Sequence, residues 1–354
     1  MLYRLGYNEH WKALFAPMIV RGLVPGRVAR VDRGSNLVFT ESRTLRAFTA
    51  KQLLNETGPE GIPAVGDWVA VRLQNDGVDA VVEAVLPRTS AFTRADPGKA
   101  PAGQVLAANI DTVFVVQSLA KALNVRRLER ELAQAWESGA NPVVVLTKRD
   151  LCADVEAVVA QAVAVAPGTP VCAVSNVTGE GMEALAAYTV SGRTVALFGA
   201  SGVGKSTLIN RLVGSEVQAT QEVRESDGKG RHTTVARELV LLPAGGVLVD
   251  TPGMRALALW GAEDGLVQAF ADIEELARHC RFRDCTHHRE PGCAVRGAVE
   301  TRALAEERLD NFRALTRELA LLAAKTDARL RSEQTRRWKT IPKSMKDRYR
   351  KRAR

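Results

Sequence analysis

The first quarter of the chain alternates short apolar runs with residues that favour turns. Residues 28–31, 36–40, 68–73 and 79–86 are such runs, and Gly, Pro, Asn or Asp separate them. Runs of this kind are typical of strands, and roughly five of them in under about 70 residues favour a small β-barrel of the OB-fold type. Such barrels often bind nucleic acid, but the same pattern also serves as a plain structural module.

From residue 109 longer apolar runs alternate with segments of helical periodicity. The expected strands cover 109–116, 142–146, 170–174 and 194–198, and the expected helices cover 125–138, 155–165 and 181–188. Residues 236–242 and 246–250 add two strands joined by a short turn. This alternation predicts a parallel sheet with helices on both faces. Ligands of such sheets bind at the carboxyl ends of the strands, where Asp150 and Ser175 fall.

The last part of the chain has helical spacing on either side of a group of Cys and His residues. Residues 266–277 and 302–324 carry the helical pattern, and the leucine stripe of the second is best explained by core packing. We therefore expect a multidomain protein: an N-terminal extension and barrel at 1–90, an α/β domain at 91–259, a helical metal-binding domain at 260–325 and a tail at 326–354.

Composition limits the class of protein. Of 354 residues, 46% are hydrophobic and 25% are charged, which is ordinary for a globular protein. No apolar run approaches the ~20 residues that span a bilayer, and residues 1–12 lack the apolar core of a signal peptide. These features predict a cytoplasmic protein that does not enter a membrane.

The net charge of +9 belongs to the C-terminal tail. Residues 326–354 hold twelve Lys or Arg and three Asp or Glu, so the rest of the chain is neutral overall. Trp338 and Tyr349 lie among these basic residues. Cations neutralise phosphates and aromatic rings stack on unpaired bases, which favours RNA as the partner, although such a run is often only a solvated end.

Residues 199–206 read Gly-Ala-Ser-Gly-Val-Gly-Lys-Ser and match the phosphate-loop pattern G-x-x-x-x-G-K-[ST] at every fixed position. An expected strand precedes them and an expected helix follows. Glycines let backbone N–H groups point at the β-phosphate, Lys205 can reach the β- and γ-phosphates, and the Ser206 hydroxyl can bind Mg²⁺. The residues expected to contact nucleotide here are Gly199, Ala200, Ser201, Gly202, Val203, Gly204, Lys205, Ser206 and Thr207.

Two further elements suit a guanine nucleotide. Asp250 ends an apolar strand and is placed to hold Mg²⁺, and Gly253 would offer its N–H to the γ-phosphate. Asp150 can accept hydrogen bonds from the N1–H and amine of guanine, donors that adenine does not present, so ATP would leave the carboxylate unpaired. The aliphatic part of Lys148 could cover one face of the base.

These elements resemble the guanine-nucleotide motifs of small GTPases in a circularly permuted order, since Thr147–Asp150 and Ser175-Asn176 precede the phosphate loop. With the barrel before them and the Cys/His group behind, they resemble the RsgA (YjeQ/EngC) family of GTPases. Thr147 stands where GTPases more often carry Asn, and Asn176 stands where Ala is usual. The resemblance implies that the Asn176 backbone N–H contacts guanine O6.

The resemblance also implies a function. It predicts a GTP hydrolase that acts, as a monomer, on the small ribosomal subunit and its rRNA late in maturation, with hydrolysis driving release. One alternative is a GTP-switched regulatory module that binds another RNA or a protein. An ATP-dependent RNA remodeller is opposed by Asp150 and by the absence of helicase-type motifs.

Hydrolysis needs a group that orients the attacking water. Met254 occupies the position of the glutamine that does this in Ras-like enzymes, and methionine cannot do it. His232 is the best replacement, and the resemblance implies the same role. Thr233 or Thr234 should close over Mg²⁺, and Thr234 is favoured. The expected catalytic residues are therefore His232, Lys205 and Thr234.

The clustered cysteines indicate a zinc site, because an odd number of cysteines in a cytosolic protein argues against disulfides. Cys280, Cys285 and Cys293 would supply three thiolates. Spacing leaves His279, His287 and His288 open as the fourth ligand, and the family pattern selects His287. Four protein ligands leave no open position, so the zinc would be structural.

Overall fold

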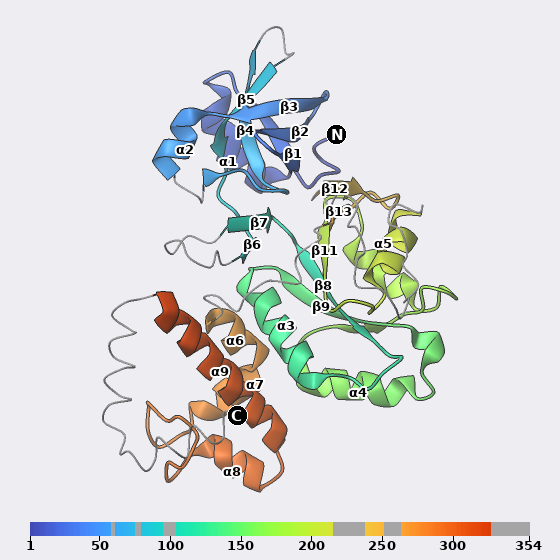
Figure 1. Cartoon of the computed structure of the whole chain (residues 1–354), viewed down its shortest axis with the longest axis vertical. Coiled ribbons are helices and arrows are strands. Elements are labelled where there is room, and N and C mark those ends of the chain that lie inside the picture. Colours follow the sequence, from blue (N-terminus) through green and yellow to red (C-terminus); the bar gives the residue numbers. More distant parts are fainter. Residues whose placement is uncertain (58–60, 75–78, 95–103, 215–237, 251–262, 327–354) are drawn as a thin grey trace, which may run out of the picture.

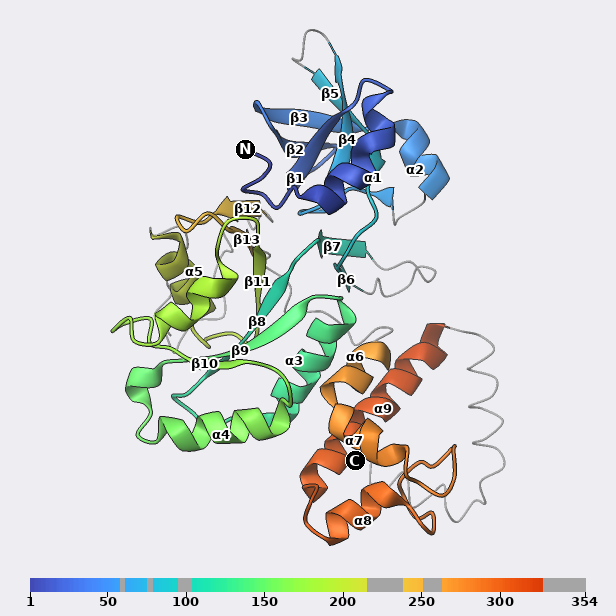
Figure 2. The same cartoon turned by 180° about the vertical axis from the view of Figure 1, so that it is seen from behind.

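The computed structural model describes residues 1–57, 61–74, 79–94, 104–214, 238–250 and 263–326. The barrel lies at one end of the long axis, the α/β sheet lies in the middle, and the C-terminal helices lie at the other end (Figure 1). The same order is seen from behind (Figure 2). The predicted fold class is confirmed in each of these parts.

Five strands of the described N-terminal residues close into a barrel. They are β1 (Val24–Asp32), β2 (Ser35–Thr40), β3 (Thr44–Thr49), β4 (Trp68–Gln74) and β5 (Asp79–Val85). Their order is β1-β2-β3-β5-β4, and β1 also pairs with β4, which completes the ring. This is the five-stranded closure expected of an OB-like barrel. The sequence analysis did not predict β3 or the helices α1 (Glu9–Ile19) and α2 (Lys51–Thr57).

The central sheet has the order β10-β9-β8-β11-β13-β12. Its parallel strands are β8 (Thr112–Ser118), β9 (Asn141–Thr147), β10 (Val171–Ala173), β11 (Thr194–Phe198) and β13 (Val247–Asp250), and β12 (Glu238–Leu241) runs antiparallel beside β13. The hairpin β6 (Ala91–Arg94) and β7 (Gln104–Ala108) connects the barrel to this sheet.

Helices cover both faces of the sheet, as predicted. Leu128 of α3 (Val125–Glu137) and Ala162 of α4 (Val155–Val165) share one core with Val113 and Val115 of β8. Phe114, which lies between these two valines in β8, packs in a second core with Leu208 of α5 (Lys205–Val213) and Leu185 of η4 (Met182–Tyr188). Successive residues of a strand face opposite sides, so the two cores lie on opposite faces of the sheet.

The barrel and the central sheet are hydrogen-bonded to each other. β1 pairs antiparallel with β12 at Arg30 and Glu238, whose charged groups lie 3.8 Å apart. The described strands of both parts therefore belong to one continuous sheet. This junction was not predicted, because the pattern of a single strand does not specify which other strand will pair with its edge.

The described C-terminal residues, 263–326, form four helices: α6 (Glu263–Ala269), α7 (Ala271–Ala277), α8 (Ala294–Glu300) and α9 (Glu306–Thr326). The helical pattern predicted over 266–277 is confirmed, but it forms two helices, because Phe270 leaves helical geometry with φ −120° and ψ 38°. Its buried ring packs against Phe312 of α9, with 5.4 Å between centroids. The helix expected from 302 begins at Glu306, since Arg302 has φ +60°.

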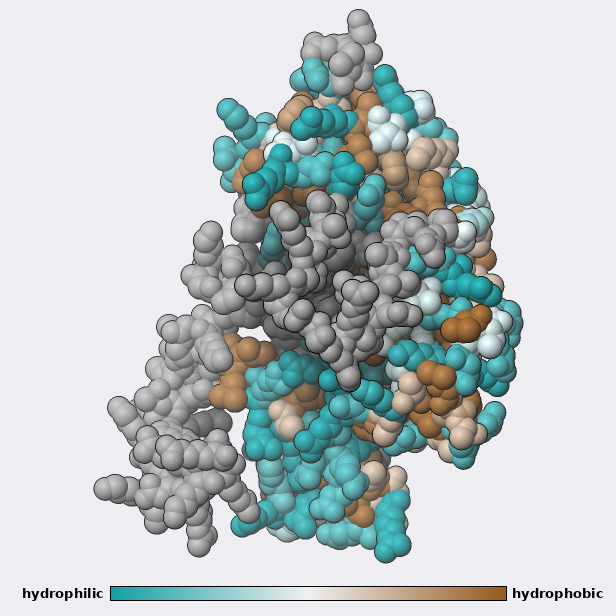
Figure 3. Space-filling view, turned by 45° about the vertical axis from the view of Figure 1, so that its right-hand side comes forward, coloured by the Kyte–Doolittle hydropathy of each residue, from teal (hydrophilic) through white to brown (hydrophobic). Residues whose placement is uncertain are grey.

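The surface seen in Figure 3 is mostly hydrophilic over the C-terminal helices, with apolar residues in small separate areas. Among the described residues, no helix has both the length and the apolar character that crossing a bilayer requires.

Candidate functional site

The predicted nucleotide-binding elements meet at one edge of the central sheet. Asp150 follows β9, Ser175 follows β10, the phosphate loop follows β11 and Asp250 ends β13. These strands are parallel, so their carboxyl ends share that edge. From β8 the chain moves to β9 and β10, whereas from β11 it moves to β13. The sheet therefore has its switch point between β8 and β11, where ligands of such folds bind.

The phosphate loop joins β11 to α5 through glycines in unusual conformations. Gly199 has φ +143°, and a Cβ there would lie 2.4 Å from the Val116 carbonyl oxygen, so no side chain fits. Gly204 has φ +93° and comes directly before the first residue of α5. The loop thus delivers backbone N–H groups to a helix N-terminus, which is a favourable arrangement for anions.

Lys205 folds over the loop that precedes it. Its ammonium donates to the Gly199 carbonyl at 2.7 Å and to the Ala200 carbonyl. The lysine is therefore held within reach of an anion seated in the loop.

Asp150 and Ser175 are brought together on the other side of the edge. The Ser175 hydroxyl donates to Asp150 Oδ1 at 2.5 Å and accepts the backbone N–H of Thr178 at 3.1 Å. Ser175 is fully buried, whereas Asp150 is exposed. Lys148 has the left-handed φ of +59°, which turns the chain from β9 into the short helix η3 (Arg149–Leu151). The buried hydroxyl thus orients a carboxylate that faces solvent.

Three side chains connect these loops to the phosphate loop. Lys148 donates from Nζ to the Gly202 carbonyl at 3.1 Å, and Asn176 donates from Nδ2 to the Gly204 carbonyl at 3.2 Å. The Thr147 hydroxyl contacts both the Val203 carbonyl and the Gln117 carbonyl, the latter at 3.0 Å. Segments that precede the phosphate loop by some thirty to fifty residues therefore form one site with it.

Several predicted residues lie outside the described part of the chain. They are His232, Thr233, Thr234 and Gly253. Asp250 is described only as the last residue of β13. Their roles stay predictions.

A buried carboxyl group beside the loop was missed by the sequence analysis. Glu131 of α3 accepts a hydrogen bond from Gln117 Nε2 at 2.5 Å. Burial raises the pKa of Glu131 to about 7, although the positive charges of Arg127 and Lys205 and the Gln117 bond each lower it. Polar residues on a helix are usually solvated, so only the packing of α3 on β8 could reveal this group.

The four predicted metal ligands form one compact cluster. The ligand atoms of Cys280, Cys285, His287 and Cys293 all lie within 4.8 Å of one another. Cys280 Sγ lies 3.9 Å from Cys293 Sγ and 3.7 Å from His287 Nδ1. A tetrahedral zinc ion with Zn–S bonds of about 2.3 Å separates its sulfur ligands by about 3.8 Å. The cluster therefore fits one zinc ion.

The position of His287 in this cluster is set by α9. The Arg313 guanidinium donates to the His287 carbonyl, and the Phe312 ring lies 6.4 Å from the imidazole. His287 is 7% exposed and has the left-handed φ of +58°. Burial lowers its pKa, which favours the neutral ring that metals bind.

Known proteins resemble this chain over most of its length. The family model for the RsgA GTPases matches residues 85–260. The small ribosomal subunit biogenesis GTPase RsgA of Streptomyces avermitilis is 51% identical over 94% of this chain and 90% of its own. The chain belongs to the RsgA GTPase family. The protein is therefore a GTP hydrolase, as the sequence predicted.

More distant relatives agree in extent and in fold. The protein of the same name from Opitutus terrae is 44% identical over 99% of this chain and 98% of its own. The crystal structure of YjeQ from Thermotoga maritima superimposes with a TM-score of 0.64 at 26% identity, over 84% of this chain and 98% of that one. A structure described as YloQ, a circularly permuted GTPase, gives a TM-score of 0.62 at 24% identity, covering 84% and 95%.

Proposed function

We propose that this GTPase binds the small ribosomal subunit and assists its late maturation, with GTP hydrolysis stimulated on the subunit and coupled to release. The observation that carries the proposal is the extent of the likeness. Relatives named small ribosomal subunit biogenesis GTPases match 94% and 99% of this chain, including the barrel and the C-terminal helices. The protein would act as a monomer in the cytoplasm, where subunits are assembled.

Guanine would be recognised by the loops that follow β9 and β10. The Asp150 carboxylate, oriented by Ser175 over 2.5 Å, would accept the N1–H and the amine of the base. The Asn176 backbone N–H would donate to O6, and the aliphatic part of Lys148 would cover one face. Adenine offers no matching pair of donors, so selectivity for GTP would depend on Asp150.

The phosphates would lie against the loop between β11 and α5. Its backbone N–H groups from Gly199 to Thr207 would surround them, and the Lys205 ammonium would exchange its contacts with the Gly199 and Ala200 carbonyls for phosphate oxygens. Hydroxyl and carboxylate oxygens are ligands that Mg²⁺ prefers, so Ser206, Thr234 and Asp250 would hold it. When bound, the ion supplies positive charge to the β- and γ-phosphate oxygens. Gly253 would donate its N–H to the γ-phosphate.

The attacking water would be positioned by His232, because Met254 cannot do so. Lys205 would stabilise the charge that develops on the transferred phosphoryl group. The alternative Mg²⁺ ligand, Thr233, stays open beside Thr234.

Binding to rRNA would use parts of the chain outside the nucleotide site. The barrel, the Cys/His cluster and the basic residues of 326–354 are the expected contacts. Cys280, Cys285, His287 and Cys293 would hold one structural zinc ion, which would support a loop too short to have its own core. The four ligands leave no open position for catalysis.

The proposal is tested by GTP turnover with purified small ribosomal subunits, large subunits or neither. Basal turnover on the order of 10⁻³ s⁻¹ or below is expected for an unassisted GTPase, and small subunits should raise it at least about tenfold. The competing function is a GTP-switched module for another RNA or protein. It is favoured if small subunits bring no increase beyond that seen with large subunits.

A further inference from the structure

Three consecutive carbonyl groups of the phosphate loop accept hydrogen bonds from the base-recognition side of the site. The Gly202 carbonyl accepts from Lys148 Nζ at 3.1 Å, and the Gly204 carbonyl accepts from Asn176 Nδ2 at 3.2 Å. The Val203 carbonyl between them accepts from the Thr147 hydroxyl. Lys148 is half-exposed, so water competes for its contact, but Thr147 is fully buried. The better shielded contacts are therefore those to Val203 and Gly204.

These contacts determine which way the loop presents its N–H groups. In a planar trans peptide the C=O and the N–H of one unit point in opposite directions. A carbonyl held toward Thr147 or Asn176 therefore turns the N–H of the following residue, Gly204 or Lys205, to the other side. The Gly204 carbonyl also accepts the backbone N–H of Leu208 at 2.9 Å, the first helical bond of α5, so the Asn176 amide adds a second donor to a carbonyl that the helix already orients. Successive N–H groups turned in this way form an anion-binding concavity.

The geometry of Asn176 points to this task. A Cβ on Gly204 would lie 3.3 Å from Thr147 Oγ1 and 3.4 Å from Asn176 Nδ2, so both donors adjoin the same residue of the loop. Reversing the amide would set Oδ1 against the Gly204 carbonyl oxygen, which fixes the orientation seen. Asn176 Oδ1 is buried and has no hydrogen-bond partner among the described residues. Such an acceptor disfavours folding, so stability alone does not account for an asparagine here.

We propose that Asn176 is a positioning residue of the phosphate loop. Its side-chain amide, with the Thr147 hydroxyl, holds the Val203 and Gly204 carbonyls so that the loop N–H groups face the nucleotide phosphates. Asn176 acts through Gly204 and its amide need not touch the phosphates. The inference rests on the proposed binding of phosphates in this loop, and it adds a side-chain role to a residue expected to contact guanine only through its backbone.

The variants Asn176→Ala and Asn176→Asp test this, with Val177→Ala as the control. Val177 is the next residue, and its side chain is 77% exposed. Affinities for GDP and GTP labelled with N-methylanthraniloyl groups are measured, and the thermal midpoint is measured without nucleotide. Asn176→Ala should weaken both nucleotides by about 3- to 10-fold, as expected for one neutral hydrogen bond, and shift the midpoint by no more than about 2 °C.

The aspartate variant keeps the size of the side chain but has no donor for Gly204. It should bind both nucleotides more weakly than Asn176→Ala, since a carboxylate oxygen would face the carbonyl oxygen. Val177→Ala should match the wild type. All three should keep the wild-type preference for guanosine over xanthosine nucleotides, because Asp150 is unchanged.

Two results would overturn the inference. Unchanged nucleotide affinity in Asn176→Ala would mean that the amide does not position the loop. A loss of affinity that merely follows a large fall in the midpoint would mean that Asn176 is structural. If the wild-type chain bound no GDP, the assignment of the phosphate loop itself would fail, and that outcome is read from the wild type alone.

Discussion

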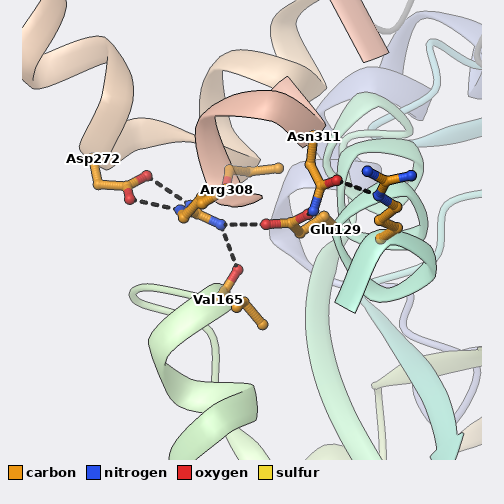
Figure 4. Close-up of polar contacts among 7 residues, drawn as sticks. Glu129, Val165, Asp272, Arg308 and Asn311 are labelled. Atoms are coloured by element: carbon orange, nitrogen blue, oxygen red, sulfur yellow. Dashed lines mark hydrogen bonds and ion pairs between the residues drawn. The ribbon is translucent and has the colours of Figure 1, made fainter. Parts of the chain in front are cut away.

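Arg308 of α9 donates through Nη1 to the Glu129 carboxylate of α3 over 2.9 Å, and both side chains are almost fully buried. Its other N–H groups donate to Asp272 and to the Val165 carbonyl (Figure 4), and to the Ala269 carbonyl at 3.0 Å. All five guanidinium donors are therefore used. Asn311 Nδ2 donates to the second Glu129 oxygen at 2.7 Å. This ion-pair network joins the C-terminal helices to α3, which packs against the central sheet.

Replacing Arg308 by Met should strongly destabilise the protein. The variant leaves Glu129 buried without its cation, and breaking a buried pair in this way typically costs about 3–5 kcal/mol. Denaturant unfolding measures the change. The control is Arg296→Met, which breaks the exposed pair with Glu300 at 3.4 Å and should cost less than about 1 kcal/mol. Equal losses in the two variants would contradict the importance assigned to the network.

Glu131 should make stability fall as the pH rises. Its folded pKa of about 7 lies above the ordinary value of 4.5. Between these values the folded chain keeps a proton that the unfolded chain has released, so the free energy of unfolding decreases with pH, by about 3 kcal/mol once the pH exceeds 7.

The variant Glu131→Gln removes that titration and keeps an acceptor for Gln117. It should match the wild type near pH 4.5 and unfold at a higher midpoint at pH 8, as thermal denaturation can measure. Glu300→Gln, at an exposed position of α8, should follow the wild type at both pH values. A Glu131→Gln midpoint that stays parallel to the wild type across this range would argue against the raised pKa.

The phosphate loop could be predicted from sequence because its backbone demands particular residues. Gly199 must lack a side chain 2.4 Å from the Val116 carbonyl, and that need is written in the motif. The strands of the sheet were predictable for a related reason, since short apolar runs rich in β-branched residues, such as β8, favour a buried strand over a helix.

Contacts between distant segments could not be predicted. Nothing in the pattern of α3 indicates that Glu129 and Glu131 are buried, because their partners Arg308 and Gln117 come from other elements. The break at Phe270 depends on packing against Phe312. The sequence indicates only that Asn176 stands where alanine is usual. The hydrogen bond from its side-chain amide to the Gly204 carbonyl depends on how the two loops are arranged in the fold.

Removing one ligand of the Cys/His cluster should remove the metal. Cys285→Ser should reduce bound zinc from about one ion per chain to near zero, because three ligands hold Zn²⁺ far less well than four. Elemental analysis of the purified protein measures this. Cys172→Ser is the matched control, since Cys172 lies in β10 outside the cluster and should leave the zinc content unchanged. Full zinc content in Cys285→Ser would contradict the assigned ligand set.

His232→Ala should lower the turnover that small ribosomal subunits stimulate and leave GTP affinity nearly unchanged. A residue that positions water typically contributes about 10²–10⁴-fold, so the stimulated rate should fall by at least about tenfold. Single-turnover GTP hydrolysis on subunits measures it. His10→Ala, at an exposed position of α1, is the control. Stimulated turnover at the wild-type level would remove His232 from the mechanism.

The central claim is that Asp150, encoded before the phosphate loop, recognises the guanine of the nucleotide held by that loop. The most direct measurement compares GTP and xanthosine triphosphate binding by the wild type and by Asp150→Asn. The account predicts that the variant loses affinity for GTP and gains it for xanthosine triphosphate, whose extra carbonyl can accept from the new amide. An unchanged preference for GTP over xanthosine triphosphate in Asp150→Asn would contradict it.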